Sequence, residues 1–196
     1  MVVAEVTVLV ATALAALLTK KSSVLPYALA LQSLALTATE VQKLLQLEPH
    51  LAFAYLGAAV VHVAAPPILL MRLERIFGER AEKAPLPLVA ASIALAATTV
   101  ALTLLESPRL LPYALASLLP ILMITYSRDP VRVAVSLNMA SNALHPLIVV
   151  EGNILYAAVS NISITMVIYV AYLLAREGWE TYRSPSLDGW DRWLKR

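Results

Sequence analysis

The chain has 196 residues, of which 60% are apolar and 14% are charged, and its formal net charge is +2. A soluble domain usually carries about 25% charged residues, so this composition predicts a membrane protein with no large domain outside the bilayer. The small net charge gives no support to nucleic-acid binding, and no nucleic-acid partner is expected. The chain has no cysteine, which excludes disulfides, thiol catalysis and cysteine-ligated metal centres.

Seven apolar runs predict an all-α bundle of about seven transmembrane helices. Each run has about 18–23 residues, which at 1.5 Å per residue matches a hydrocarbon core of about 30 Å. Barrel strands would alternate apolar and polar residues, and runs such as Leu86–Leu105 show no alternation. The predicted spans are residues 2–19, 24–46, 51–71, 85–105, 109–126, 130–151 and 154–175.

The first run is predicted to be a span rather than a cleaved signal peptide. No basic segment precedes it, and Glu5 lies near its start. We expect Glu5 to lie at the membrane interface.

The basic residues predict the orientation of the bundle. With the N-terminus outside, 13 of the 15 Lys and Arg residues lie on the inner side, and only Lys43 and Arg109 lie outside. Enrichment of Lys and Arg on the cytoplasmic side sets orientation, so the N-terminus is predicted outside and the C-terminus inside. The outer connections are very short, which makes neighbouring helices antiparallel.

Two inner segments carry most of the remaining charge. Residues 72–83 mix basic and acidic side chains before Pro85 and Pro87, which predicts a short solvated extension of the third helix and a proline-fixed start of the fourth. Residues 1–175 would form the bundle and residues 176–196 a cytoplasmic interfacial tail that holds Trp179, Trp190 and Trp193. The alternatives for this tail are a disordered segment tethered by its aromatic residues and a segment docked onto a cytoplasmic partner.

Polar side chains within the predicted spans are few. Such groups usually face a bundle interior or a water-filled path. Asn138, Asn142 and His145 are spaced i, i+4 and i+7, within about 60° on a helical wheel. Pro146 leaves the carbonyl of Asn142 without its helical donor, and Pro66 does the same to the carbonyl of His62.

These side chains predict an ion path inside the bundle, because the pKa of histidine lies near neutrality and suits a proton relay. The predicted path residues are Gln32, Glu40, His62, Asn138, Asn142 and His145. The alternative for the amides and hydroxyls is packing between helices, at about 0.6 kcal/mol for an average hydrogen bond. Glu40 has the alternative of lying near the outer end of its span, where water reaches it.

The sequence predicts no catalytic residue, cofactor or metal site. It has no nucleophile–base arrangement, no glycine-rich phosphate loop and no pair of histidines with zinc spacing. Haem bound between His62 and His145 is an alternative that requires both histidines at one depth and facing each other.

Parts of the chain correspond to one another. The first two helices with the basic turn at residues 20–23 match the fifth and sixth helices with the turn at residues 127–130, in the same direction. Gln32 and Asn138 lie about 10–12 positions after these turns. The string LPYALA also occurs twice, at Leu25–Ala30 and Leu111–Ala116, but on helices predicted to run in opposite directions.

A helix, a basic cytoplasmic turn and a helix with polar residues at mid-membrane resemble the K-type subunit of complex I and the C-type subunit of cation/proton antiporters. The segment Arg128–Leu144 carries this resemblance best, and residues 109–175 would make the three-helix K-type unit. With its extra N-terminal helices and the segment Tyr27–Ser33, the chain most resembles the component E subunit of hydrogenase-4 and formate hydrogenlyase-type complexes.

This resemblance implies a non-catalytic subunit in the ion-translocating membrane arm of a redox-driven proton or sodium pump, with antiporter-like and other membrane subunits as partners. The K-type family uses glutamates in its central polar axis, whereas this chain has Gln32 and Asn138 at the roughly corresponding places. Either His145 and Glu40 replace those glutamates, or the subunit shapes a wet path without carrying the proton. The other hypotheses are a stand-alone small transporter, an assembly factor and a membrane anchor for a soluble redox enzyme.

Overall fold

The computed structural model describes residues 2–44, 48–105, 108, 110–150 and 154–182, without the side chains of 40–44, 148–150, 154, 155 and 182. Over these residues the chain is all-helical, as predicted, with seven α-helices and a 3₁₀ turn at Ser22–Val24. The α-helices are α1 (Val2–Leu18), α2 (Leu25–Leu44), α3 (Pro49–Phe77), α4 (Leu86–Leu104), α5 (Leu110–Tyr126), α6 (Pro130–Val150) and α7 (Ile154–Tyr182).

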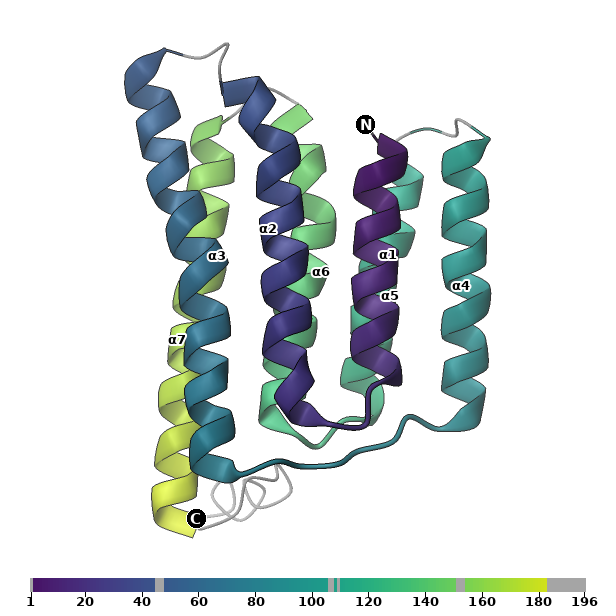
Figure 1. Ribbon diagram of the computed structural model, residues 1–196, viewed down its shortest axis with the longest axis vertical. Helices are drawn as coiled ribbons and strands as arrows, with labels where there is room; N and C mark the ends of the chain where they lie inside the picture. Colours follow the sequence, from purple (N-terminus) through teal and green to yellow (C-terminus); the bar gives the residue numbers. More distant parts are fainter. Residues whose placement is uncertain (1, 45–47, 106–107, 109, 151–153, 183–196) are drawn as a thin grey trace.

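The helices form two layers of three, with α4 at one edge (Figure 1). Helices α1, α2 and α3 lie side by side in one layer, and each packs on its counterpart α5, α6 or α7 in the other layer. Successive helices are antiparallel, so the two members of each pair run in the same direction. Helix α4 contacts α1 and α5 and joins two similar three-helix units.

This pairing follows the correspondence between the two basic turns and not the repeated string. Helices α2 and α5, which carry the two copies of LPYALA, run in opposite directions. Tyr27 of the first copy is 62% exposed, whereas Tyr113 of the second is buried. The two copies therefore occupy different environments.

The bundle has an apolar lateral surface, and several polar side chains are buried within its mainly apolar core. Helices α3, α4 and α7 (the last over Tyr156–Thr181) are long and apolar enough to cross a membrane, and α1 and α5 are shorter apolar helices of 17 residues. Large apolar side chains are exposed along the helices, with Phe53 at 78% and Leu86 at 80%, whereas several amide and histidine side chains are buried. Soluble proteins rarely expose so many large apolar side chains while burying amides and histidines, so α3, α4 and α7 have the character of membrane spans.

Prolines begin several helices. Helices α3, α4 and α6 have a proline in their first turn, where its missing N–H leaves no helical hydrogen bond unmade. Asp129 precedes α6, and its Oδ1 accepts a hydrogen bond from Val131 N at 2.9 Å. Prolines inside α3, α5 and α6 do not end these helices, as is tolerated in membrane bundles where neighbouring helices satisfy the freed carbonyls.

Helices α3 and α7 extend beyond the predicted spans. Each has 29 residues, or about 43 Å at 1.5 Å per residue, which exceeds a hydrocarbon core of about 30 Å. Both extensions lie at the end of the bundle that holds the basic turns (Figure 1). There the rings of Phe77 and Trp179 pack with centroids 5.5 Å apart. The first residues of the predicted tail, 176–182, are therefore helical, and Trp190 and Trp193 lie outside the described residues.

Candidate functional site

Asn142 of α6 is the hub of a buried polar centre between the two layers. Its Nδ2 donates to Gln32 Oε1 at 3.1 Å and to Ser33 Oγ at 3.0 Å, and its Oδ1 lies 2.8 Å from His62 Nε2. An amide oxygen only accepts, so His62 carries its hydrogen on Nε2. All four side chains are at most 5% exposed. The centre thus ties α2 and α3 of one layer to α6 of the other.

The polar centre continues to α1. Gln32 Nε2 donates to Thr12 Oγ1 at 2.9 Å, and Thr12 Oγ1 donates to Val8 O at 2.7 Å. A continuous chain of hydrogen bonds therefore runs from Thr12 through Gln32 and Asn142 to His62, with a titratable ring at one end.

A small cavity adjoins this chain. The space open to the centre of a water molecule is about 10 Å³, which is room for about one water. The lining residues are Ser33, Leu36, Thr37, His62, Asn142, His145 and Asn161. His62 and His145, 83 positions apart in the sequence, therefore border the same space.

His145 also lies against α3. Its Nε2 is 3.4 Å from the hydroxyl of Tyr55, a residue that is seven positions before His62 and so on the same face of α3. The Nε2 atom of His62 thus faces Asn142 and that of His145 faces Tyr55, and the cavity that both histidines border has room for about one water, far less than a haem needs. This geometry gives no support to the haem alternative.

The structure brings together four of the six predicted path residues: Gln32, His62, Asn142 and His145. Asn138 is fully buried one turn away from Asn142, and neither of its amide atoms has a partner among the described residues. Glu40 belongs to α2, but its side chain lies outside the described part of the chain.

Sequence reasoning missed several contributors. Thr12 could have been recognised as a hydroxyl residue in the middle of an apolar helix. Tyr55 could have been recognised because it is seven positions before His62. Glu5 was expected at the interface, but its side chain is 4% exposed and accepts a hydrogen bond from the Tyr113 hydroxyl of α5. Its partner Tyr113 belongs to α5, which packs against α1.

The segment 72–83 corrects a second expectation in part. Arg72, Arg75, Glu79 and Lys83 are exposed, as expected of a solvated segment, but Glu74 and Arg80 are largely buried. Arg80 Nη2 binds Glu74 Oε1 at 2.7 Å and Asp129 Oδ1 at 2.9 Å, and Ser22 Oγ donates to Glu74 Oε2 at 2.9 Å. The Arg80, Glu74 and Asp129 side chains are 17%, 9% and 5% exposed. Glu74 lies beyond the predicted span; burial raises the pKa of its carboxyl, and the charge of Arg80 opposes this shift.

Arg132, which the charge pattern placed at the inner side of the predicted sixth span, is fully buried in α6. Its guanidinium donates to the carbonyls of Ala16 and Thr19, each at 3.1 Å, and its Nε lies 3.4 Å from Glu82 Oε2. These carbonyls end α1, where the last turn lacks helical donors. The basic-end ion network, defined as Glu74, Arg80, Glu82, Asp129 and Arg132, links the connections at the basic end of the bundle.

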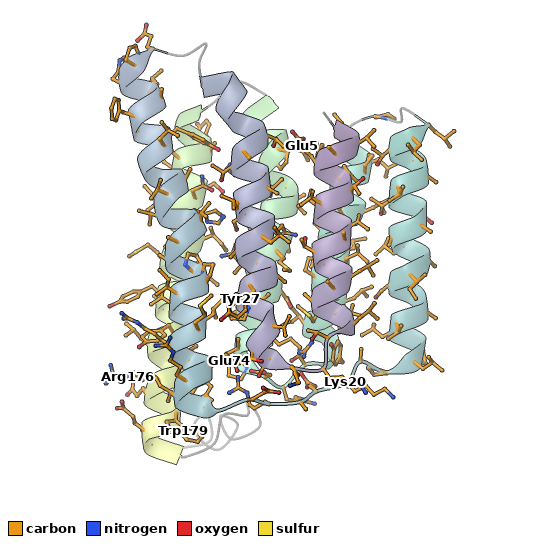
Figure 2. The ribbon with its side chains drawn as sticks, in the orientation of Figure 1. Glu5, Lys20, Tyr27, Glu74, Arg176 and Trp179 are labelled. Atoms are coloured by element: carbon orange, nitrogen blue, oxygen red, sulfur yellow. The ribbon has the colours of Figure 1, made fainter. Side chains whose placement is uncertain are left out.

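The network and Glu5 lie at opposite ends of the molecule. Figure 2 shows Glu74 and Lys20 at the end with the basic turns and Glu5 near the other end, and the polar centre lies between these ends. Among the described residues, no group of three or more His, Asp or Glu side chains is arranged to hold a metal ion. Comparison of the chain with models of protein families, with curated proteins and with solved structures finds no match.

Proposed function

We propose that the chain is a multi-pass protein of the cell membrane with seven spans, its N-terminus outside and its C-terminus in the cytoplasm. Three observations support this placement: the apolar lateral surface, the antiparallel order of successive helices and the basic connections at one end. Helices α1 and α5, with 17 residues each, are about 26 Å long, close to the thickness of a thin hydrocarbon core.

Within that membrane, the function supported best is a non-catalytic subunit of a complex I-related energy-converting hydrogenase or similar redox-driven pump, which contributes to the path of protons or sodium ions. The observation that carries this proposal is the buried hydrogen bond between His62 and Asn142 beside a cavity with room for about one water. A buried titratable side chain inside a span marks an ion path by default. The resemblance of Arg128–Leu144 to K-type subunits supplies the redox-driven context.

In this proposal, His62 and His145 take the place of the glutamates of K-type subunits. Gln32 and Asn142 cannot gain or lose a proton at neutral pH, but they hold the His62 ring beside a cavity with room for about one water. His145 borders the same cavity and is the second titratable group there. A proton would move between the two rings through that water.

Conduction requires the centre to open, because the cavity holds about one water. Prolines give α3 and α6 a place to bend: Pro66 and Pro146 leave the carbonyls of His62 and Asn142 without helical donors. Redox chemistry elsewhere in the complex would shift these helices and admit more water.

The test is redox-driven pumping in inverted membrane vesicles. His62→Ala, and separately His145→Ala combined with Glu40→Gln, should lower pumping by about tenfold or more while electron transfer continues. His50→Ala is the control, because His50 is an exposed histidine outside the centre. Pumping at the wild-type rate in both sets of variants would contradict the relay.

A stand-alone small transporter is the second candidate. The observation that favours it is the pairing of two parallel three-helix units with a polar centre between them, since many transporters bind substrate at the interface of internal repeats. Purification from membranes separates the candidates. Co-purification with large antiporter-like subunits favours the pump, whereas a homo-oligomer that transports a solute alone favours the transporter.

A further inference from the structure

Two clefts of similar size lie at the basic end of the bundle and differ in charge. The first, about 440 Å³, lies between α2 and α3, and its charged lining is Glu74, Arg75 and Glu79. The second, about 510 Å³, lies between the end of α1 and the start of α4. Its lining residues are Leu18, Lys20, Lys83, Ala84, Pro85, Leu86 and Val89. The second cleft therefore offers two cations and no carboxylate.

The backbone brings the two lysines together. Lys20 O accepts a hydrogen bond from Glu82 N at 2.9 Å, so the two connections that carry Lys20 and Lys83 run next to each other. Both side chains are exposed, and no ion pair of the described residues involves either of them. Lys21 behaves differently, because its Nζ is 3.1 Å from Glu79 Oε1.

The rest of the second cleft is apolar and faces the side of the bundle. Leu18 is 50% exposed and Leu86 is 80% exposed, and both lie where the apolar surfaces of α1 and α4 meet the basic end. Figure 2 shows Lys20 at this end of the bundle. A molecule that fits must carry negative charge at one end and apolar groups beside it.

We propose that this cleft, defined by Lys20, Lys83, Leu18 and Leu86, binds the headgroup of an anionic phospholipid of the inner leaflet. The inference rests on the proposed membrane placement and goes beyond the ion path. Lysine binds phosphate as a point charge, and basic pockets between helices on the cytoplasmic side hold acidic headgroups. The acyl chains would lie along α1 and α4 and fix α4, which joins the two three-helix units.

The test measures lipid binding by the full purified chain in neutral detergent. Native mass spectrometry with equal amounts of phosphatidylglycerol and phosphatidylcholine should show one phosphatidylglycerol retained preferentially. The double variant Lys20→Gln/Lys83→Gln should lower this preference about 30-fold, since each lysine near a headgroup contributes roughly a factor of five. Lys21→Gln is the control, and it should keep the wild-type preference.

Three results would overturn the proposal: equal retention of both lipids by the wild-type chain, an unchanged preference in the double variant, and saturation of the site by glycerol phosphate without acyl chains. The competition on the wild-type chain decides the matter even if the double variant does not fold. Selective lipid binding by the wild-type chain, together with wild-type pumping in the histidine variants, would leave this proposal intact and contradict the ion path. Loss of pumping in the histidine variants, together with equal retention of both lipids, would contradict this proposal and leave the ion path intact.

Discussion

Asn142 binds three side chains at once: its Nδ2 donates to Gln32 and Ser33, and its Oδ1 accepts from His62. This geometry fixes the orientation of the amide and the tautomer of the His62 ring together. A buried, hydrogen-bonded amide positions its neighbours and does not carry a proton, so the titratable groups of the centre are the histidines. Asn138, one turn away, has the same burial and no partner among the described residues.

Asn142→Ala should therefore cost more stability than Asn138→Ala. At about 0.6 kcal/mol per hydrogen bond in a membrane bundle, the loss of three bonds lowers the free energy of unfolding by about 2 kcal/mol. Asn138→Ala breaks no hydrogen bond of the described residues and should lower it by clearly less. Unfolding in mixed micelles measures both variants, and equal losses would show that the hydrogen bonds at Asn142 do not hold the helices together.

Much of the polar centre could be predicted from the sequence, but not its partners. The helical spacing of Asn142 and His145 placed them on one face, and both line the cavity. The bonds from Asn142 to His62 and Gln32 join residues 80 and 110 positions apart, and no local pattern encodes such pairings. Asn138 shares the face of Asn142 and His145, yet it does not line the cavity, because facing inward does not specify which neighbour a side chain meets.

At the scale of elements, the basic-end ion network joins three connections into one unit. Arg80 links α3 to the start of α6, and Arg132 links α6 to the end of α1. The charges of residues 72–83 are typical of a solvated helix when taken alone. Glu74 and Arg80 are nevertheless largely buried, because their partners come from other connections, such as Asp129 and Ser22, which the sequence order does not place beside them.

Arg132→Ala should be strongly destabilising. It removes the cation beside Glu82 and the donor to two carbonyls at the end of α1, and breaking a buried ion pair costs about 3–5 kcal/mol. Arg176→Ala is the matched control, because the pair of Arg176 with Glu180 is exposed and such pairs contribute little. Thermal unfolding of both variants in one detergent checks this. A similar melting temperature for both would show that the network does not stabilise the basic end of the bundle.

At the scale of the whole molecule, the polar centre lies between two three-helix units, α1–α3 and α5–α7, whose paired helices run in the same direction. Helix α4 joins the two units at the edge (Figure 1). The apolar runs of the sequence located the seven helices of the described residues. The sequence predicted that α3 extends past its apolar run, but it placed the end of α7 too early, and there Trp179 packs on Phe77 of the α3 extension. The two layers and their pairing depend on contacts between distant segments, and only the two basic turns hinted at them.

The most direct test is the accessibility of single cysteines, which a chain without cysteine permits. Leu31, Val60 and Ile93, all exposed on the sides of helices, should resist a water-soluble maleimide in intact cells once replaced by cysteine. His50→Cys should react from outside the cell, and Lys21→Cys only after the membrane is opened. If the lateral positions react freely, or if His50→Cys and Lys21→Cys react from the same side, the helices do not enclose their polar centre within a membrane.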